Sequence, residues 1–276
     1  MRAAPELNSR STAGGEVERL GHNHWCLRIP AGPAGRYRWA QLDDYLHLPR
    51  ASFRSRPPLA LHLRARVSHP DLEGTWGFGF WNDPFSAGLG LGGAVRQLPA
   101  LPNACWFFYA SPPNYLALRD DHPAQGFLTA TFSSPTVSPR GKSPDFSALL
   151  LLPTAGRGDP APTEDRAVPL MAWPRAARTI RRLARRFIGE AAASVEVTPT
   201  EWHAYGLEWC SDAVHFSLDG QPLWETTIAP RGRLGLVIWI DNQYAAFPPG
   251  GRLRFGTLAT AEPGWLEVAD VEVEVP

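Results

Sequence analysis

The chain has 276 residues with 27 basic and 27 acidic side chains, so its formal net charge at pH 7 is zero. This length permits one large β domain or two ordinary domains. A net charge of zero argues against a nucleic-acid-binding protein, which needs a basic excess. No apolar run approaches the ~18 residues that a membrane-spanning helix requires, and the N-terminus lacks the apolar core of a signal peptide.

Two residue types limit the chemistry further. The three cysteines, Cys26, Cys105 and Cys210, are widely spaced and have no metal-binding pattern. They favour free thiols in a reducing compartment, so we predict a cytoplasmic protein with no metal site. The single lysine, Lys142, makes Schiff-base chemistry and a lysine phosphate loop poor candidates. We expect no cofactor.

The first clear elements along the chain alternate with a period of two, which is typical of half-buried strands. In residues 59–67, leucine, alanine and valine share one face, while histidine and arginine share the other. In residues 74–81, Trp76, Phe78 and Phe80 alternate with threonine and glycine. A face of glycines predicts backbone packed closely against a neighbour or a ligand.

The segment from Pro174 to about Ala193 breaks this pattern and predicts a helix. Its apolar residues recur at helical spacing, and six arginines against one glutamate fill most other positions. The apolar stripe consists of Ile180, Leu183, Ala184, Phe187, Ile188 and Ala191. Together with the proline-rich stretch before it, this helix predicts a loop-plus-helix insertion at about 133–193 in one domain spanning 1–276. The basic helix either packs on the domain or docks on a membrane surface, an acidic partner or an anionic ligand.

Five further segments in the last third of the chain also predict strands. Each is short, and turn residues separate it from the next. The segments are 203–209, 214–220, 233–240, 252–260 and 265–275. Many short strands separated by turns indicate an all-β sandwich or barrel.

Several of these segments together suggest a family. EWHAYGLEWCSDAVHFSLDGQPLWET (201–226) has a His-x-Tyr strand ending in Glu-Trp, then a turn, then a strand closing in Asp-Gly. LRARVSHPDLEGTWGFGFWND (63–83) precedes it, and RLGLVIWIDNQY (233–244) and LEVADVEVEV (266–275) follow it. In this order they resemble family-16 glycoside hydrolases, the laminarinase- and lichenase-like enzymes. The resemblance implies a concanavalin A-like jelly-roll β-sandwich with one concave face.

One stretch departs from that family, whose members hydrolyse β-glucans with carboxylates spaced as Glu-x-Asp-x-(x)-Glu. The nucleophile and the acid/base must face one cleft, roughly 5–5.5 Å apart. The corresponding stretch here, 101–118, contains no Asp or Glu. The expected positions hold Ala104, Trp106 and Phe108, or, one place over, Cys105, Phe107 and Tyr109. We therefore expect no family-16 hydrolysis.

An aromatic, largely uncharged concave cleft is the candidate site that remains. Aromatic rings stack on sugars or enclose apolar molecules, and polar residues at strand ends can hydrogen-bond a ligand. The candidate ligand-binding residues are Trp81 (or Trp76), Asn82, Trp106, Tyr109, Trp239 and Asn242. For an enzyme, the candidate proton donors are Asp83 and Asp241, or the cluster Asp120, Asp121 and His122.

Three functions stay open at this point. The first is a binding module that holds a carbohydrate or an apolar small molecule in the cleft. The second is an intracellular isomerase, cyclase or lyase that acts on an apolar substrate in the same cleft. The third is an interaction protein whose basic helix docks a partner. We expect a small-molecule or oligosaccharide ligand and no nucleic acid.

Overall fold

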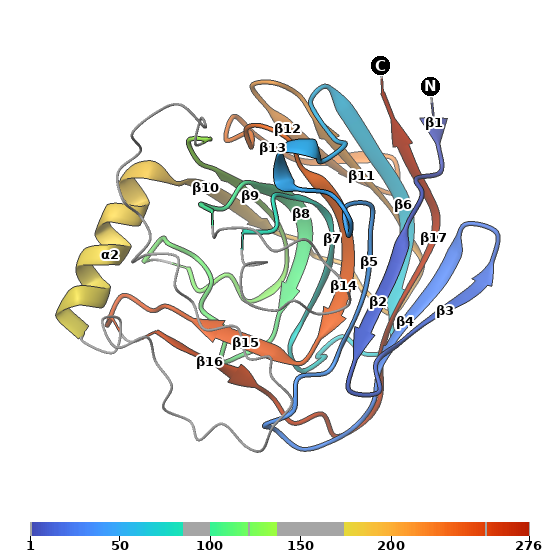
Figure 1. Ribbon diagram of the computed structural model, residues 1–276, viewed down its shortest axis with the longest axis horizontal. Helices are drawn as coiled ribbons and strands as arrows, with labels where there is room; N and C mark the ends of the chain where they lie inside the picture. The colour runs from blue at the N-terminus through green and yellow to red at the C-terminus, as the bar shows by residue number, and fades with distance from the viewer. Residues whose placement is uncertain (1, 85–99, 121, 137–173, 252, 276) are drawn as a thin grey trace.

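The computed structural model describes residues 2–84, 100–120, 122–136, 174–251 and 253–275. These residues form two large antiparallel sheets that pack face to face (Figure 1). The predicted all-β jelly-roll sandwich is therefore confirmed. The predicted strands 59–67 and 203–209 have the expected bounds, and the other predicted strands differ by three residues at most.

Sheet A carries both ends of the described chain. Its strands lie in the order β13 (Gln221–Thr226), β12 (Val214–Leu218), β11 (His203–Trp209), β6 (Leu59–Val67), β17 (Gly264–Glu274), β4 (His24–Ile29) and β3 (Glu16–Gly21), with β1 (Arg2–Ala3) paired to β17.

Sheet B carries the candidate site. Its strands lie in the order β10 (Gly189–Ser194), β9 (Gly126–Ser133), β8 (Ala104–Ala110), β7 (Thr75–Trp81), β14 (Gly235–Asp241), β5 (Trp39–Asp43) and β2 (Asn8–Thr12). A short 3-10 turn, η1 (Arg50–Ser52), lies between β5 and β6 in the sequence.

The main core lies between the two sheets, where every second residue of each strand points inward. Phe78 of β7 and Phe107 of β8 each approach Tyr205 of β11, with ring centroids 5.0 Å apart in both pairs. The buried cluster extends through leucine, isoleucine and valine side chains of both sheets. Because side chains alternate along a strand, the remaining residues of sheet B point away from sheet A. These residues form the outer face of sheet B.

Sheet B curves around the side on which helix α2 and the hairpin β15 (Gln243–Ala246) and β16 (Arg254–Thr257) lie (Figure 1). An isolated bridge between Tyr115 and Ala246 joins this hairpin to the segment after β8. Both elements therefore flank the outer face of sheet B.

Helix α2 spans Pro174–Phe187, so the predicted end near Ala193 was wrong. The last residues of the predicted helix form β10 instead, because they pair in register with β9 at the edge of sheet B. The predicted insertion at 133–193 is still a prediction, since residues 137–173 lie outside the described part of the chain. Among the described residues, no helix is long and apolar enough to cross a bilayer.

Candidate functional site

The outer face of sheet B has an aromatic half over β14, β7, β8 and β9. Cross-strand register places Trp239, Gly77 and Phe108 in one row. In the next row Gly79 of β7 lies beside Trp106 of β8. Aromatic side chains of β14 and β8 thus stand on either side of a strand that carries glycine between them.

Four rings make this half of the face continuous, and we call them the aromatic face: Trp81, Trp106, Phe108 and Trp239. The indoles of Trp81 and Trp239 are nearly parallel, at 8°, with centroids 6.5 Å apart. Trp106 lies 5.4 Å from Trp239 and 5.5 Å from Phe108. The three tryptophans are half-buried, so part of each ring stays open to solvent.

Two glycines of β7 make this packing possible. A Cβ on Gly77 would lie 2.8 Å from Cη2 of Trp239 and closer still to a backbone oxygen of β8. A Cβ on Gly79 would lie 2.6 Å from the Cβ of Trp106, and Gly79 has a φ of +153°. The alternation of glycine and aromatics in 74–81 therefore reflects close approach of neighbouring indoles, one of the two causes that the sequence left open.

The other half of the outer face is polar and lies over β2 and β5. Asp43 is fully buried, and its Oδ2 accepts hydrogen bonds from Arg10 Nε at 2.8 Å and Gln41 Nε2 at 2.9 Å. Gln41 Nε2 also donates to the Tyr45 hydroxyl at 3.3 Å, and Trp81 Nε1 donates to the same hydroxyl at 2.6 Å. This polar network, formed by Arg10, Gln41, Asp43 and Tyr45, is joined to the aromatic face through Trp81.

Asp241 lies at the end of β14 and is also joined to the aromatic face. Trp239 Nε1 donates to Thr75 Oγ1 at 3.0 Å, and Thr75 Oγ1 donates to Asp241 Oδ1 at 2.9 Å. The Tyr37 hydroxyl donates to Asp241 Oδ2 at 3.3 Å. Burial raises the pKa of Asp241 to about 6, because hydrogen bonds from Gln243, Thr75 and Tyr37 offset only part of the desolvation.

The structure brings some of the sequence-predicted residues together. Trp81, Trp106 and Trp239 form the centre of the aromatic face. The hydroxyl of Thr75 connects Asp241 to Trp239 through two hydrogen bonds. Tyr109 must be corrected, because it lies three residues after Trp106 on the same strand and therefore points to the opposite side. It is buried between the sheets, stacked on Trp76 with centroids 5.5 Å apart.

The predicted polar residues at the strand ends have backbone partners. The buried amide of Asn82 bonds to the backbone of Leu101 and Asn103. The buried amide of Asn242 bonds to the backbone of Arg36, Arg38 and Leu258. Asp83 has a φ of +45°, and its carbonyl oxygen accepts a hydrogen bond from Arg50. These contacts brace the ends of β7 and β14.

The alternative acid/base cluster after β8 has a structural role. The Asp120 carboxylate accepts hydrogen bonds from Arg181 Nε at 3.1 Å and from Arg185 Nη1 at 2.6 Å. His122 Nδ1 accepts a hydrogen bond from the backbone of Ala124, and residue 121 lies outside the described part of the chain. This loop therefore holds helix α2.

Arg10, Gln41, Asp43 and Tyr45 were not found by sequence reasoning. Arg10 lies on β2, Gln41 and Asp43 lie on β5, and Tyr45 follows β5. The sequences of these two strands carry only a weak alternating pattern. Within the described ranges, no group of three or more His, Cys, Asp or Glu side chains could hold a metal ion.

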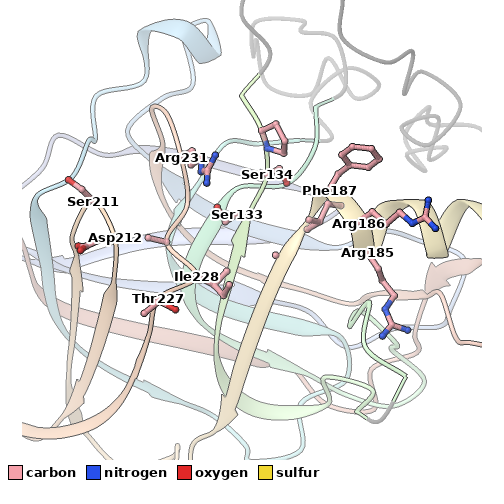
Figure 2. A pocket seen from close by; sticks show the side chains of 14 residues that line it. Ser133, Ser134, Arg185, Arg186, Phe187, Ser211, Asp212, Thr227, Ile228 and Arg231 are labelled. Atoms are coloured by element: carbon pink, nitrogen blue, oxygen red, sulfur yellow. The ribbon is translucent and has the colours of Figure 1, made fainter.

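A cavity of about 550 Å³ lies away from the aromatic face, at the end of the sandwich. It is bounded by the end of β9, the junction of α2 with β10, and the segment between β13 and β14. Figure 2 shows the side chains of Arg185 and Arg186 directed away from Ile228 and Ser133. We place the candidate site on the aromatic face, because open rings and a polar network meet there.

Comparison with solved structures gives matches along nearly the whole chain. A β-glucanase from Bacillus licheniformis matches at a TM-score of 0.46 and 7% identity, over 97% of this chain and 92% of that chain. LamAcat from Zobellia galactanivorans matches at 0.42 and 10%, over 93% and 79% of the two chains. A legume lectin-like domain from Entamoeba histolytica matches at 0.45 and 7%, over 97% and 88%.

No protein-family model matches the sequence, and no curated protein matches it. At this level of structural similarity the function has to be inferred from the chain's own residues.

Proposed function

We propose that the aromatic face binds a carbohydrate or another small molecule with a flat apolar side. The observation that carries this proposal is the contact between Trp81, Trp106 and Trp239, three half-buried indoles whose rings stay partly open on one face. Large rigid rings give contact area at low entropic cost, and they stack on the apolar face of a sugar ring.

The polar network beside the rings favours a carbohydrate over a hydrocarbon. A sugar has an apolar face and a polar rim, which match the aromatic half and the polar half of the sheet. Trp106 Nε1 is also buried without a hydrogen-bond partner among the described residues. Because this nitrogen is covered, a ligand oxygen would reach it only if the indole turned, and a hydrocarbon would leave it without a partner in either position.

The charges on this face favour a neutral ligand. Arg10 is paired with the buried Asp43 at 2.8 Å, so the two charges compensate each other. Asp241 accepts four hydrogen bonds from the protein. Neither carboxylate is placed to attract a cationic ligand, and the only arginine in the polar network is already neutralised.

The absence of carboxylates on β8 supports binding without family-16 hydrolysis. The outward positions of this strand hold Ala104, Trp106, Phe108 and Ala110. Alanine and aromatic side chains supply neither a nucleophile nor a general acid.

A thermal-shift screen tests this proposal. One panel holds neutral β- and α-linked oligosaccharides, a second holds sulfated oligosaccharides, and a third holds terpenoids and fatty acids. A ligand at 100 times its Kd adds about 2.7 kcal/mol of stability, which moves the midpoint by several degrees at roughly 2–4 °C per kcal/mol. We expect shifts with neutral oligosaccharides. No shift in any panel, or shifts with apolar compounds alone, would overturn carbohydrate binding.

An enzyme is the second candidate, and Asp241 is the observation that favours it. A carboxyl with a pKa of about 6 exchanges protons near neutral pH, as a general acid or base requires. Its link to the aromatic face runs through Thr75 and Trp239. Product analysis of each compound that shifts the midpoint tests this candidate: turnover by the wild type and binding without turnover by Asp241→Asn would support it. Unchanged compounds would exclude it for those ligands.

A further inference from the structure

Arg10 of β2 lies in the same row of the outer face as the centre of the aromatic face. Cross-strand register pairs Arg10 with Gln41 of β5, and Gln41 with Trp239 of β14. Directly opposed residues point to the same side of a sheet, and neighbouring strands lie roughly 4.8 Å apart. A sugar ring stacked on Trp239 would therefore have one edge on the side of Gln41 and Arg10.

The guanidinium of Arg10 is held in place by three neighbours. Its Cζ lies 5.4 Å from the ring centroid of Trp39 and 6.0 Å from that of Tyr45. Its Nε donates to the buried carboxylate of Asp43 at 2.8 Å, and the side chain is only 11% exposed. A side chain that is fixed in this way loses little conformational entropy when it binds a ligand.

The two terminal nitrogens of Arg10 are open. Among the described residues, Nη1 and Nη2 have no hydrogen-bond acceptor, and neither belongs to the buried side-chain atoms that lack a partner. They therefore lie in the exposed part of the side chain. Together they form one edge of the planar guanidinium, with two donors side by side.

Gln41 adds an acceptor beside this edge. Its Nε2 donates to Asp43 at 2.9 Å and to the Tyr45 hydroxyl at 3.3 Å. Because a carboxylate only accepts, the amide must turn Nε2 toward Asp43, which leaves Oε1 on the other side. Within the described ranges Oε1 has no donor, and it is not a buried atom. Two open donors and one open acceptor thus lie in one row with Trp239.

We propose that Arg10 makes the aromatic face selective for 1,4-linked glucan chains, by donating from Nη1 and Nη2 to two adjacent free hydroxyl groups of one glucose unit. This inference rests on the carbohydrate binding proposed above and names the class of ligand. Each internal unit of a 1,4-linked glucan has free hydroxyls on the adjacent carbons C2 and C3. In a 1,3-linked glucan the C3 oxygen belongs to the linkage, and the free hydroxyls on C2 and C4 are too far apart for one guanidinium edge.

The neighbours of Arg10 favour hydroxyl groups over an anionic group. Asp43 compensates the charge of Arg10 at 2.8 Å, so the pair has little net attraction for an anion. A charged donor still forms a stronger hydrogen bond to a hydroxyl oxygen than a neutral donor does. The open Oε1 of Gln41 can accept a proton from a hydroxyl, whereas it would repel an anionic oxygen.

Titration calorimetry with three neutral hexaoses tests the proposal on the full chain. Cellohexaose and maltohexaose are 1,4-linked, and laminarihexaose is 1,3-linked. Arg10→Lys keeps the positive charge beside Asp43 but replaces two fixed donors by one ammonium group. The matched control is Arg66→Lys on sheet A, because Arg66 also lies over a tryptophan, at 4.9 Å, and its Nε donates to the buried Glu267 at 2.8 Å. Circular dichroism checks that each variant folds.

We expect the wild type and Arg66→Lys to bind a 1,4-linked hexaose about tenfold or more tightly than laminarihexaose. Arg10→Lys should bind that 1,4-linked hexaose about tenfold more weakly and laminarihexaose as before, so that the preference disappears. Equal affinities in the wild type, a preference for laminarihexaose, or a preference that Arg10→Lys keeps would overturn the selectivity and leave carbohydrate binding intact. Absence of binding to all three hexaoses would overturn the selectivity as well, while the wider thermal-shift panels decide the proposed function.

Chemical modification of the wild type tests the contact without a variant. Phenylglyoxal modifies guanidinium groups, and mass mapping of peptides follows the modification of Arg10 and Arg66 separately. We expect a bound 1,4-linked hexaose to protect Arg10 and to leave the modification of Arg66 unchanged. Equal modification of Arg10 with and without the bound hexaose would overturn the proposal.

Discussion

The indole Nε1 of Trp81 donates a 2.6 Å hydrogen bond to the hydroxyl of Tyr45. The same hydroxyl accepts a hydrogen bond from Gln41, and Gln41 binds the buried carboxylate of Asp43. The orientation of a ring on the aromatic face therefore depends on the polar network in the other half of the same outer face. This relationship makes Tyr45 a positioning residue for Trp81.

Replacing Tyr45 with phenylalanine tests this role. Tyr45→Phe keeps the ring packing but removes the acceptor for Trp81 Nε1, so we expect a loss of about 1–3 kcal/mol in the free energy of unfolding. Ligand affinity should fall as well, because Trp81 is no longer held. Urea unfolding and titration calorimetry measure the two effects. Tyr244→Phe is the control, and equal behaviour of the two variants would contradict the positioning role.

Gly79 should not tolerate a side chain. Gly79→Ala would place a Cβ 2.6 Å from Cα and Cβ of Trp106, at a residue whose φ is +153°. We therefore expect the free energy of unfolding to fall by at least ~2 kcal/mol and Trp106 to be displaced. Thermal unfolding measures the loss of stability, and tryptophan fluorescence reports the displacement. Gly250→Ala has open space around the added Cβ and should change neither. A stable Gly79→Ala with unaltered fluorescence would contradict the close packing of β7 and β8.

Asp241 should make the stability depend on pH. Its pKa rises from 3.8 to about 6 on folding because burial disfavours the charged form. The folded state therefore keeps a proton that the unfolded chain has released, and the free energy of unfolding decreases as pH rises from 3.8 to about 6. Asp241→Asn removes this pH-dependent decrease in the free energy of unfolding. Its amide oxygen can still accept hydrogen bonds from Thr75 and Gln243.

We expect Asp241→Asn to be more stable than the wild type at neutral pH by about 1–3 kcal/mol, with the difference vanishing near pH 4. Chemical unfolding across this range measures it. The pKa of Asp44 is also raised to about 6 by burial, and its contribution cancels because both proteins contain it. A stability difference that is constant with pH would contradict the raised pKa of Asp241.

Arg181 should be essential for holding α2. Its guanidinium binds Asp120 and donates to the carbonyls of Ala117, Arg119 and Phe247. Arg181→Met leaves these carbonyls without this donor, while Asp120 keeps Arg185. We therefore expect a loss of about 1–3 kcal/mol in the free energy of unfolding and faster hydrogen exchange in α2 and residues 117–120. The exposed neighbour gives a matched control, Arg182→Met. Unchanged exchange in Arg181→Met would mean that the apolar contacts of Ala184 and Ile188 hold the helix alone.

Much of the fold could be predicted from the sequence because period-two alternation survives wherever one face of a strand is buried. Residues 59–67 and 203–209 are clear examples, and both have the predicted bounds. The helix end was misjudged because Ala191 fits a helical stripe and an edge strand equally well. Pairing with β9 makes this segment a strand. The local sequence pattern does not reveal that pairing, because β9 lies far away along the chain.

The candidate site could be predicted only in part. The three tryptophans were found because large aromatic residues at strand positions are distinctive. The prediction for Tyr109 was wrong, because it lies three residues after Trp106 on the same strand and therefore points to the other face of the sheet. Arg10 and Asp43 were missed because their pairing joins residues 33 apart in the chain.

Titration calorimetry on tryptophan variants tests the central claim most directly. The ligand is the oligosaccharide that gives the largest thermal shift, and the variants are Trp106→Ala, Trp239→Ala and, as a control near β11 of sheet A, Trp202→Ala. We predict that each aromatic-face variant loses at least tenfold in affinity, about 1.4 kcal/mol, while Trp202→Ala binds like the wild type. Folded Trp106→Ala and Trp239→Ala proteins with wild-type affinity would contradict ligand binding on this face.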